Sequence, residues 1–418
     1  MPLSETSAAP LDKTPQTLSQ HPWLVAIAGM VAMASAMGIG RFAFTPLLPM
    51  MLHDGRITLT QGSWLAMSNY IGYFVGSIVC MALPWVVKGW AQRLHPARMV
   101  RWGLLVTMAL TAAMAVDWPA GWATLRFLSG VASAVVFLNI TLWCMSQLAY
   151  LGRPAISGLL FCGPGLGIAV TGLATSAMVA ANWQATSGWA AFALLALVCV
   201  FLVSPVVHGP LAQPAAPATP VAGHTAEGPL DRSLLAVAYS FAGLGYIVTA
   251  TYLPVIARGA LPSGSVWPDL FWPMFGGGVA LGAYLSTLVP LQWDRRKLLA
   301  AGYGLQVVAI AIPLALPTPV GFALGSILLG LPFTAITFFA LQEARRIWPS
   351  AISSFPGLLT AAYGLGQIIG PPMVAFMLAH TATVEAGFAY GLAAAAMALV
   401  IGVLLLAVMV LRHPHRIR

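Results

Sequence analysis

Apolar segments of membrane-spanning length recur along the whole of this chain. A transmembrane helix needs about 20 predominantly apolar residues, and only 7% of the 418 residues are charged while 59% are hydrophobic. That composition leaves too little charged surface for a soluble protein of this size. The sequence therefore predicts an all-α polytopic membrane protein. Breaking the chain at charges and Pro/Gly clusters gives twelve spans, at residues 23–52, 62–87, 99–116, 119–147, 156–182, 186–207, 233–257, 267–291, 298–316, 319–342, 351–380 and 386–411.

The second half of the chain repeats features of the first. Gly40 lies nine residues before Pro49, and Gly245 lies nine residues before Pro254. Arg41 follows Gly40, and Tyr246 occupies the matching position after Gly245. A stretch rich in proline and alanine separates the halves and is typical of a flexible linker. The sequence thus predicts two parallel six-helix repeats. The expected divisions are a tail over 1–22, a bundle over 23–207, the linker over 208–232, a second bundle over 233–411 and a tail over 412–418.

Basic residues divide unevenly between the two sides of the predicted spans. With the N-terminus inside, the outer loops hold only Arg56 and Arg258 of the 19 lysines and arginines, and Arg41 and Arg126 lie within spans. Basic loops stay on the cytoplasmic side, so both tails are predicted to be cytoplasmic in a cell inner membrane. The net charge of +9 then reflects topology, and we expect the lipid bilayer, not nucleic acid, as a partner.

Arg41 stands inside the first apolar segment, between a pair of glycines and a pair of prolines. A charge at that depth costs roughly 3 kcal/mol or more unless it faces protein or trapped water. Arg126 is a second intramembrane base that could reach a similar depth. Guanidinium groups suit carboxylates and phosphates, so the pair indicates an anion site. The structural alternative is that each arginine bonds carbonyls freed by Pro46 and Pro49 or clamps a helix contact, and Arg126 could also extend toward water.

No acidic residue lies deep in any predicted span. A proton-coupled transporter of cations would be expected to bury an aspartate or glutamate, so its absence favours an anionic or neutral substrate. Asp269, at the start of the eighth span, is the candidate for a coupling proton. The alternative is an acid placed favourably at a helix N-terminus.

The sequence also carries a family resemblance. The run Gly38-Ile39-Gly40-Arg41-Phe42-Ala43-Phe44-Thr45-Pro46-Leu47-Leu48-Pro49 resembles the signature of the YbfB/YjiJ family of major facilitator superfamily (MFS) transporters. Trp64-Leu65-Ala66 with Asn69-Tyr70 and Gly72-Tyr73 is similar to the same family, as is Arg126-Phe127-Leu128-Ser129-Gly130. The resemblance covers essentially all twelve spans. It implies the major facilitator fold of 12 transmembrane helices, with a site between the halves lined by the first and fourth helices of each.

Polar and aromatic side chains on the expected cavity-lining helices are candidates for holding a ligand by hydrogen bonds and stacking. Each could equally be an interhelical hydrogen bond. With the two arginines, these substrate-binding candidates are Asn69, Tyr70, Asn139, Tyr246, Tyr363 and Gln367.

We therefore expect a secondary active transporter for a small organic anion or polar metabolite, working by alternating access. Export is the direction that we consider for it, and the sequence does not fix the direction. No Ser/His/Asp, Cys/His or HExxH arrangement falls at membrane depth, so we expect no enzyme, cofactor or metal site, and a monomer. Two alternatives stay open. An amphipathic drug exporter would need an electronegative cavity, and a non-transporting membrane sensor would need a soluble signalling extension.

Overall fold

The computed structural model describes residues 18–414 except 88, 90–93, 212–227, 291 and 349–353. The described residues form helices and no strand. Their order is η1 (Leu18–Gln20), α1 (Pro22–Met33), η2 (Ala34–Phe42), α2 (Phe44–His53), α3 (Leu59–Val86), α5 (Pro96–Ala113), α6 (Pro119–Tyr150), η3 (Pro154–Phe161), α7 (Cys162–Ala180), α8 (Ala185–Val203), α9 (Pro229–Ala260), α10 (Trp267–Thr287), α11 (Arg295–Ala315), α12 (Pro319–Gly330), α13 (Phe333–Ile347), α14 (Ser354–His380) and α15 (Val384–Arg412).

Joining the elements that follow one another without a loop gives twelve helical segments among the described residues, each covering most of a predicted span. Ten are long and apolar enough to cross a membrane. The other two are α5, which carries Arg98 and Arg101 in its first two turns, and α10, which contains two prolines and a run of three glycines. The predicted all-α membrane fold is confirmed. Pro46 and Pro49 do not end the first helical segment, since α2 runs through both prolines and the irregular turn lies earlier, in η2.

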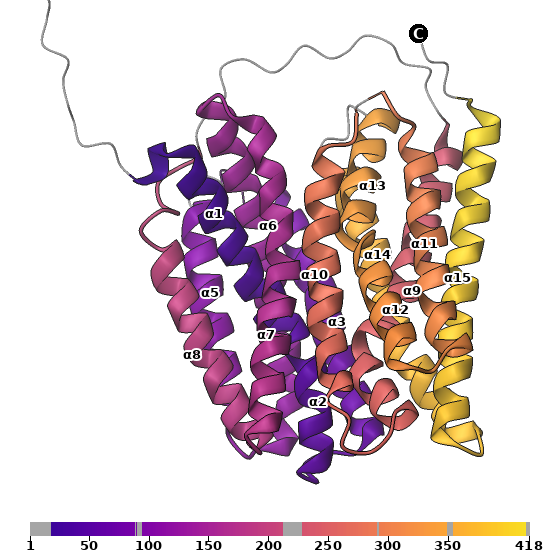
Figure 1. The fold of residues 1–418 in the computed structure, drawn as a ribbon. Coiled ribbons are helices and arrows are strands. Elements are labelled where there is room, and N and C mark those ends of the chain that lie inside the picture. The colour runs from indigo at the N-terminus through magenta and orange to yellow at the C-terminus, as the bar shows by residue number, and fades with distance from the viewer. Residues whose placement is uncertain are drawn as a thin grey trace, which may run out of the picture.

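The two halves of the chain lie side by side. Figure 1 shows α1–α8, in indigo to magenta, on one side and α9–α15 on the other, with η1 and the end of α15 at the same end of the bundle. Between the halves, α7 packs against α10 and α3 against α14.

The same glycine contact holds each half together. A Cβ added at Gly130 of α6 would lie 2.1 Å from the carbonyl oxygen of Asn69 on α3, and one added at Gly330 of α12 would lie 2.3 Å from that of Phe275 on α10. These helices therefore touch backbone to backbone, as small residues allow in membranes. Gly130 and Gly330 each follow a glycine, Gly121 or Gly321, by nine residues, and Asn69 and Phe275 each precede a glycine, Gly72 or Gly278, by three. The contacts therefore occupy matching positions of the two halves, so the sequence repeat is also a repeat of packing.

Candidate functional site

A wide helical turn places Arg41 in the centre of the molecule. Residues Ala34–Phe42 form a π-helix, η2, between the α-helices α1 and α2. π-Helical insertions are rare in proteins overall, but many of those that occur lie at functional sites. The turn fits because a Cβ at Gly38 would lie 2.5 Å from the backbone of Gly167 on α7. The glycine at position 38 thus allows η2 and α7 to approach backbone to backbone.

The guanidinium of Arg41 is buried, with 3% of the residue exposed. Its Nη2 donates to Oε1 of Gln367 on α14 at 2.8 Å, and its Cζ lies 4.0 Å from the ring centroid of Tyr73 and 5.5 Å from that of Tyr70. Its Nε is buried without a partner. Among the described residues no carboxylate pairs with Arg41. The charge is therefore held by one amide and by aromatic faces.

Gln367 connects Arg41 to the residue that replaces it in the second repeat. Its Nε2 donates to the hydroxyl of Tyr246 at 2.6 Å. Tyr246 stacks on Tyr363 with ring centroids 5.7 Å apart, and Tyr363 stacks on Tyr239 at 4.7 Å. The two asymmetric positions of the repeat thus meet through a single side chain, and three tyrosines extend the site into the second half.

Arg126 has a different kind of environment. Its Nη1 and Nη2 donate to the carbonyls of Gly40 and Arg41 at 3.3 and 3.0 Å. These carbonyls lie where η2 gives way to α2, just before Pro46, which has no N–H to offer. Asn69 donates to the carbonyls of Gly40 and Arg126 at 3.3 and 2.9 Å. The contacts of Arg126 and Asn69 are those of the structural alternative, because they hold the Arg41 turn to α3 and α6.

The remaining candidates divide. Tyr70 bonds across the halves, with its hydroxyl 2.9 Å from Oγ1 of Thr251. Asn139 lies apart, since it donates to the carbonyl of Val135 in its own helix, more than three turns beyond Arg126. Asp269, in the first turn of α10, pairs with Arg258.

The sequence interpretation did not select the aromatic residues nearest to Arg41. Tyr73 lies under the guanidinium, while Phe42 packs against Trp272 and Phe333 at 6.1 Å each. Two signals were available for Tyr73. It follows Tyr70 by three residues and so shares its helix face, and it belongs to the second-span stretch that resembles the family. Phe42, Trp272 and Phe333 come from three different helices, and no sequence spacing connects them.

Replacing Arg126 by glutamine is expected to lower the stability of the ligand-free protein. The Gly40 carbonyl keeps its hydrogen bonds from Asn69 and Ser129, but the Arg41 carbonyl loses its donor Arg126. A buried group without a partner costs roughly 1–3 kcal/mol. Thermal unfolding in detergent measures the effect. If the Arg126→Gln variant had the melting temperature of the wild type, the two hydrogen bonds from Arg126 would not stabilise η2.

The fold and the buried cationic site define a major facilitator transporter. The chain belongs to the family described as the uncharacterised MFS-type transporter YbfB, whose family model matches residues 33–407. Among solved structures it is similar to "Crystal structure of nucleoside transporter NupG (D323A mutant)", with a TM-score of 0.70 and 13% identity over 92% of this chain and 99% of that chain. A search of the curated proteins found no match. The protein is thus a multi-pass membrane transporter of a small molecule.

Proposed function

We propose that this protein transports a small organic anion, which binds Arg41 between the two halves. The observation that carries the proposal is the buried guanidinium of Arg41 without a carboxylate partner among the described residues. A charge inside the membrane costs roughly 3 kcal/mol or more when it is left uncompensated. A carboxylate or phosphate would neutralise it and accept two parallel hydrogen bonds from the planar group.

The location of Arg41 suits transport by alternating access. Arg41 belongs to the first half and its partner Gln367 to the second. Four further hydrogen bonds between described residues join the halves. Three are those of Thr45 Oγ1 to the Ala250 carbonyl at 2.8 Å, of Tyr70 with Thr251, and of the Tyr252 hydroxyl to Ser63 Oγ at 2.6 Å. The fourth runs from Ser176 Oγ to the Asp269 carbonyl at 2.7 Å. We propose that the bundles 23–207 and 233–411 rock about this site. All of these hydrogen bonds break when the site opens to the side of the membrane on which they lie.

We propose an inner-membrane location with both tails cytoplasmic, from the distribution of basic residues. The meeting of η1 and the end of α15 at one end of the bundle supports it (Figure 1).

Asp269 is a poor proton carrier while it pairs with Arg258. We therefore propose that any coupled proton travels on the substrate.

A neutral polar metabolite is the second candidate. Gln367, Tyr246 and Tyr363 offer uncharged hydrogen-bonding groups and stacked rings beside Arg41. The similar structure named above is titled a nucleoside transporter, which fits an uncharged, ring-containing ligand. The two candidates differ in whether the ligand must carry a negative charge.

Thermal unfolding of the purified protein against matched pairs of ligands tests this proposal. Each pair is a carboxylate and its amide, or a phosphate ester and its alcohol, with organic cations as a third group. A ligand at about a hundred times its dissociation constant adds roughly 2.7 kcal/mol of stability. We expect stabilisation by one class of acids and not by their amides. Equal stabilisation by the amides would favour the neutral candidate, and stabilisation by cations alone would refute both.

Flux of the stabilising compound in reconstituted vesicles then tests transport itself. Uptake and release are measured on the same vesicles, with and without a pH gradient, which decides direction and proton coupling. Binding without flux in either direction would favour the sensor alternative.

A further inference from the structure

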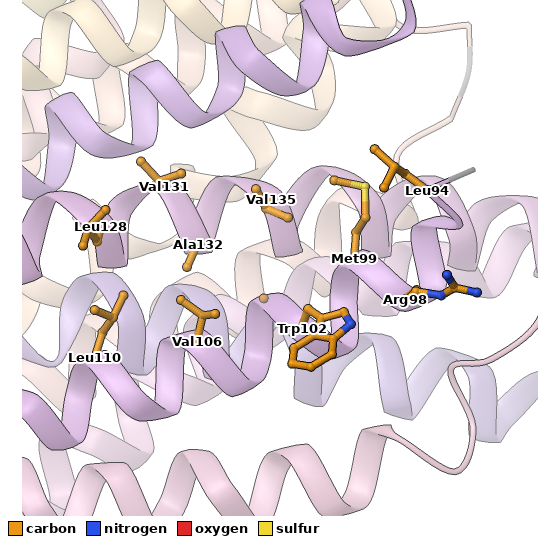
Figure 2. A pocket seen from close by; sticks show the side chains of 11 residues that line it. Leu94, Arg98, Met99, Trp102, Val106, Leu110, Leu128, Val131, Ala132 and Val135 are labelled. Atoms are coloured by element: carbon orange, nitrogen blue, oxygen red, sulfur yellow. The ribbon is translucent and has the colours of Figure 1, made fainter. Parts of the chain in front are cut away.

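A groove with one charged end runs along the outer surface of the first half. It has a volume of about 460 Å³ and lies between α5 and α6. Figure 2 shows Arg98 and Trp102 toward one end of the lining residues and Leu110 and Leu128 at the other. Apart from Arg98, the side chains that line it are apolar, with the indole N–H of Trp102 as their one polar group.

The shape of the groove follows from residue size. Gly103 and Ala132, its smallest lining residues, are buried, while Trp102, Val106 and Leu128 are 63%, 43% and 42% exposed. A Cβ at Gly103 would lie 2.5 Å from Val136 on α6. Close approach at these small residues forms the bottom of the groove, and the larger side chains form its rims.

The groove is long enough to hold a lipid acyl chain. From Arg98 to Leu110 the helix rises about 18 Å at 1.5 Å per residue, and half of the hydrocarbon core is about 15 Å thick. Arg98 lies near the start of α5, at headgroup level, and Trp102 follows one turn later, as interfacial tryptophans do. A lipid chain lying in the groove would reach past the middle of α5 to Leu110, in the last turn of that helix.

Charge decides which lipid fits. Arg98 is exposed, and among the described residues no carboxylate pairs with it or with Arg101 three residues on. An arginine at headgroup level attracts anionic lipid, and basic pockets between transmembrane helices bind such headgroups. Of these two arginines, only Arg98 lines the groove. We propose that this groove binds one anionic glycerophospholipid, with its phosphate on Arg98 and one acyl chain between α5 and α6. Because the other face of α5 packs against η2 near Thr107, the site is separate from Arg41.

Native mass spectrometry of the purified protein tests the proposal by titration with phosphatidylglycerol and with phosphatidylcholine of the same acyl chains. We expect phosphatidylglycerol to bind at least about fivefold more tightly, the effect of one arginine near anionic headgroups. Arg98→Gln should abolish that preference. Val106→Trp, which fills the groove, should weaken binding of both lipids.

Two control variants match these changes elsewhere on the surface. Arg153→Gln removes an exposed arginine outside the groove, and Val198→Trp enlarges an exposed valine of α8. Both should leave lipid binding as in the wild type. Equal binding of the two lipids by the wild type would overturn the proposal, as would a preference that survives Arg98→Gln. Displacement of the lipid by free glycerol phosphate would assign the site to a soluble phosphate compound instead.

Discussion

Replacing Arg41 by glutamine is expected to abolish stabilisation by the anionic ligand while leaving the ligand-free protein as stable as the wild type. Truncating one partner of a buried charge pair costs about 2–5 kcal/mol, so affinity should fall by at least about 30-fold. In the ligand-free protein the change removes a buried charge that has no carboxylate partner among the described residues. The gain in desolvation offsets the lost hydrogen bond to Gln367. Thermal unfolding with and without ligand measures both effects.

Two further variants separate charge from shape and from position. Arg41→Lys keeps the charge but loses the planar pair of donors, so it should bind the anion with intermediate affinity. Arg56→Gln removes an arginine from a loop ion pair with Asp117 and should leave binding unchanged. Anion binding that survives Arg41→Gln would sink the proposed site. A severe loss of ligand-free stability in that variant would instead make Arg41 a structural residue.

Replacing Gly282 by alanine is expected to have the largest effect on folding. A Cβ there would lie 1.7 Å from the carbonyl oxygen of Leu331, which is backbone and can move only if the helices separate. Overpacking of this kind costs roughly 1–3 kcal/mol, and occasionally more. Thermal unfolding in detergent measures the effect, and size-exclusion chromatography shows whether the variant remains folded.

The same helix supplies the control. Gly277 is exposed, and an added Cβ there would meet no atom within 4 Å. Gly277→Ala should be neutral or stabilise by up to about 1 kcal/mol, because alanine is the better helix former. Equal melting temperatures for the two variants would show that the contact between α10 and the segment after α12 is not tight. That result would argue against the repeated glycine packing of the two halves.

The membrane fold could be predicted from the sequence because hydropathy, loop charge and the glycine repeat are properties of short segments. Spans, repeat and family follow from such local patterns, and the burial of Arg41 follows from one charge in an apolar stretch. These features survive an uncertainty of several residues in each helix boundary. The structure shows the same twelve segments among its described residues.

Only the tertiary structure decided what each polar residue contacts. The sequence placed both Arg41 and Arg126 among the substrate-binding candidates, yet Arg41 bonds Gln367 across the halves while Arg126 bonds the backbone of η2. Asn139 was predicted to bind substrate, and in the structure its side chain donates to the carbonyl of Val135 in its own helix. The reason is rotational: each residue turns a helix by about 100°, and the π-helix shifts that register within η2. Which side chains face one another therefore depends on how the helices pack, which the pattern of apolar residues leaves open.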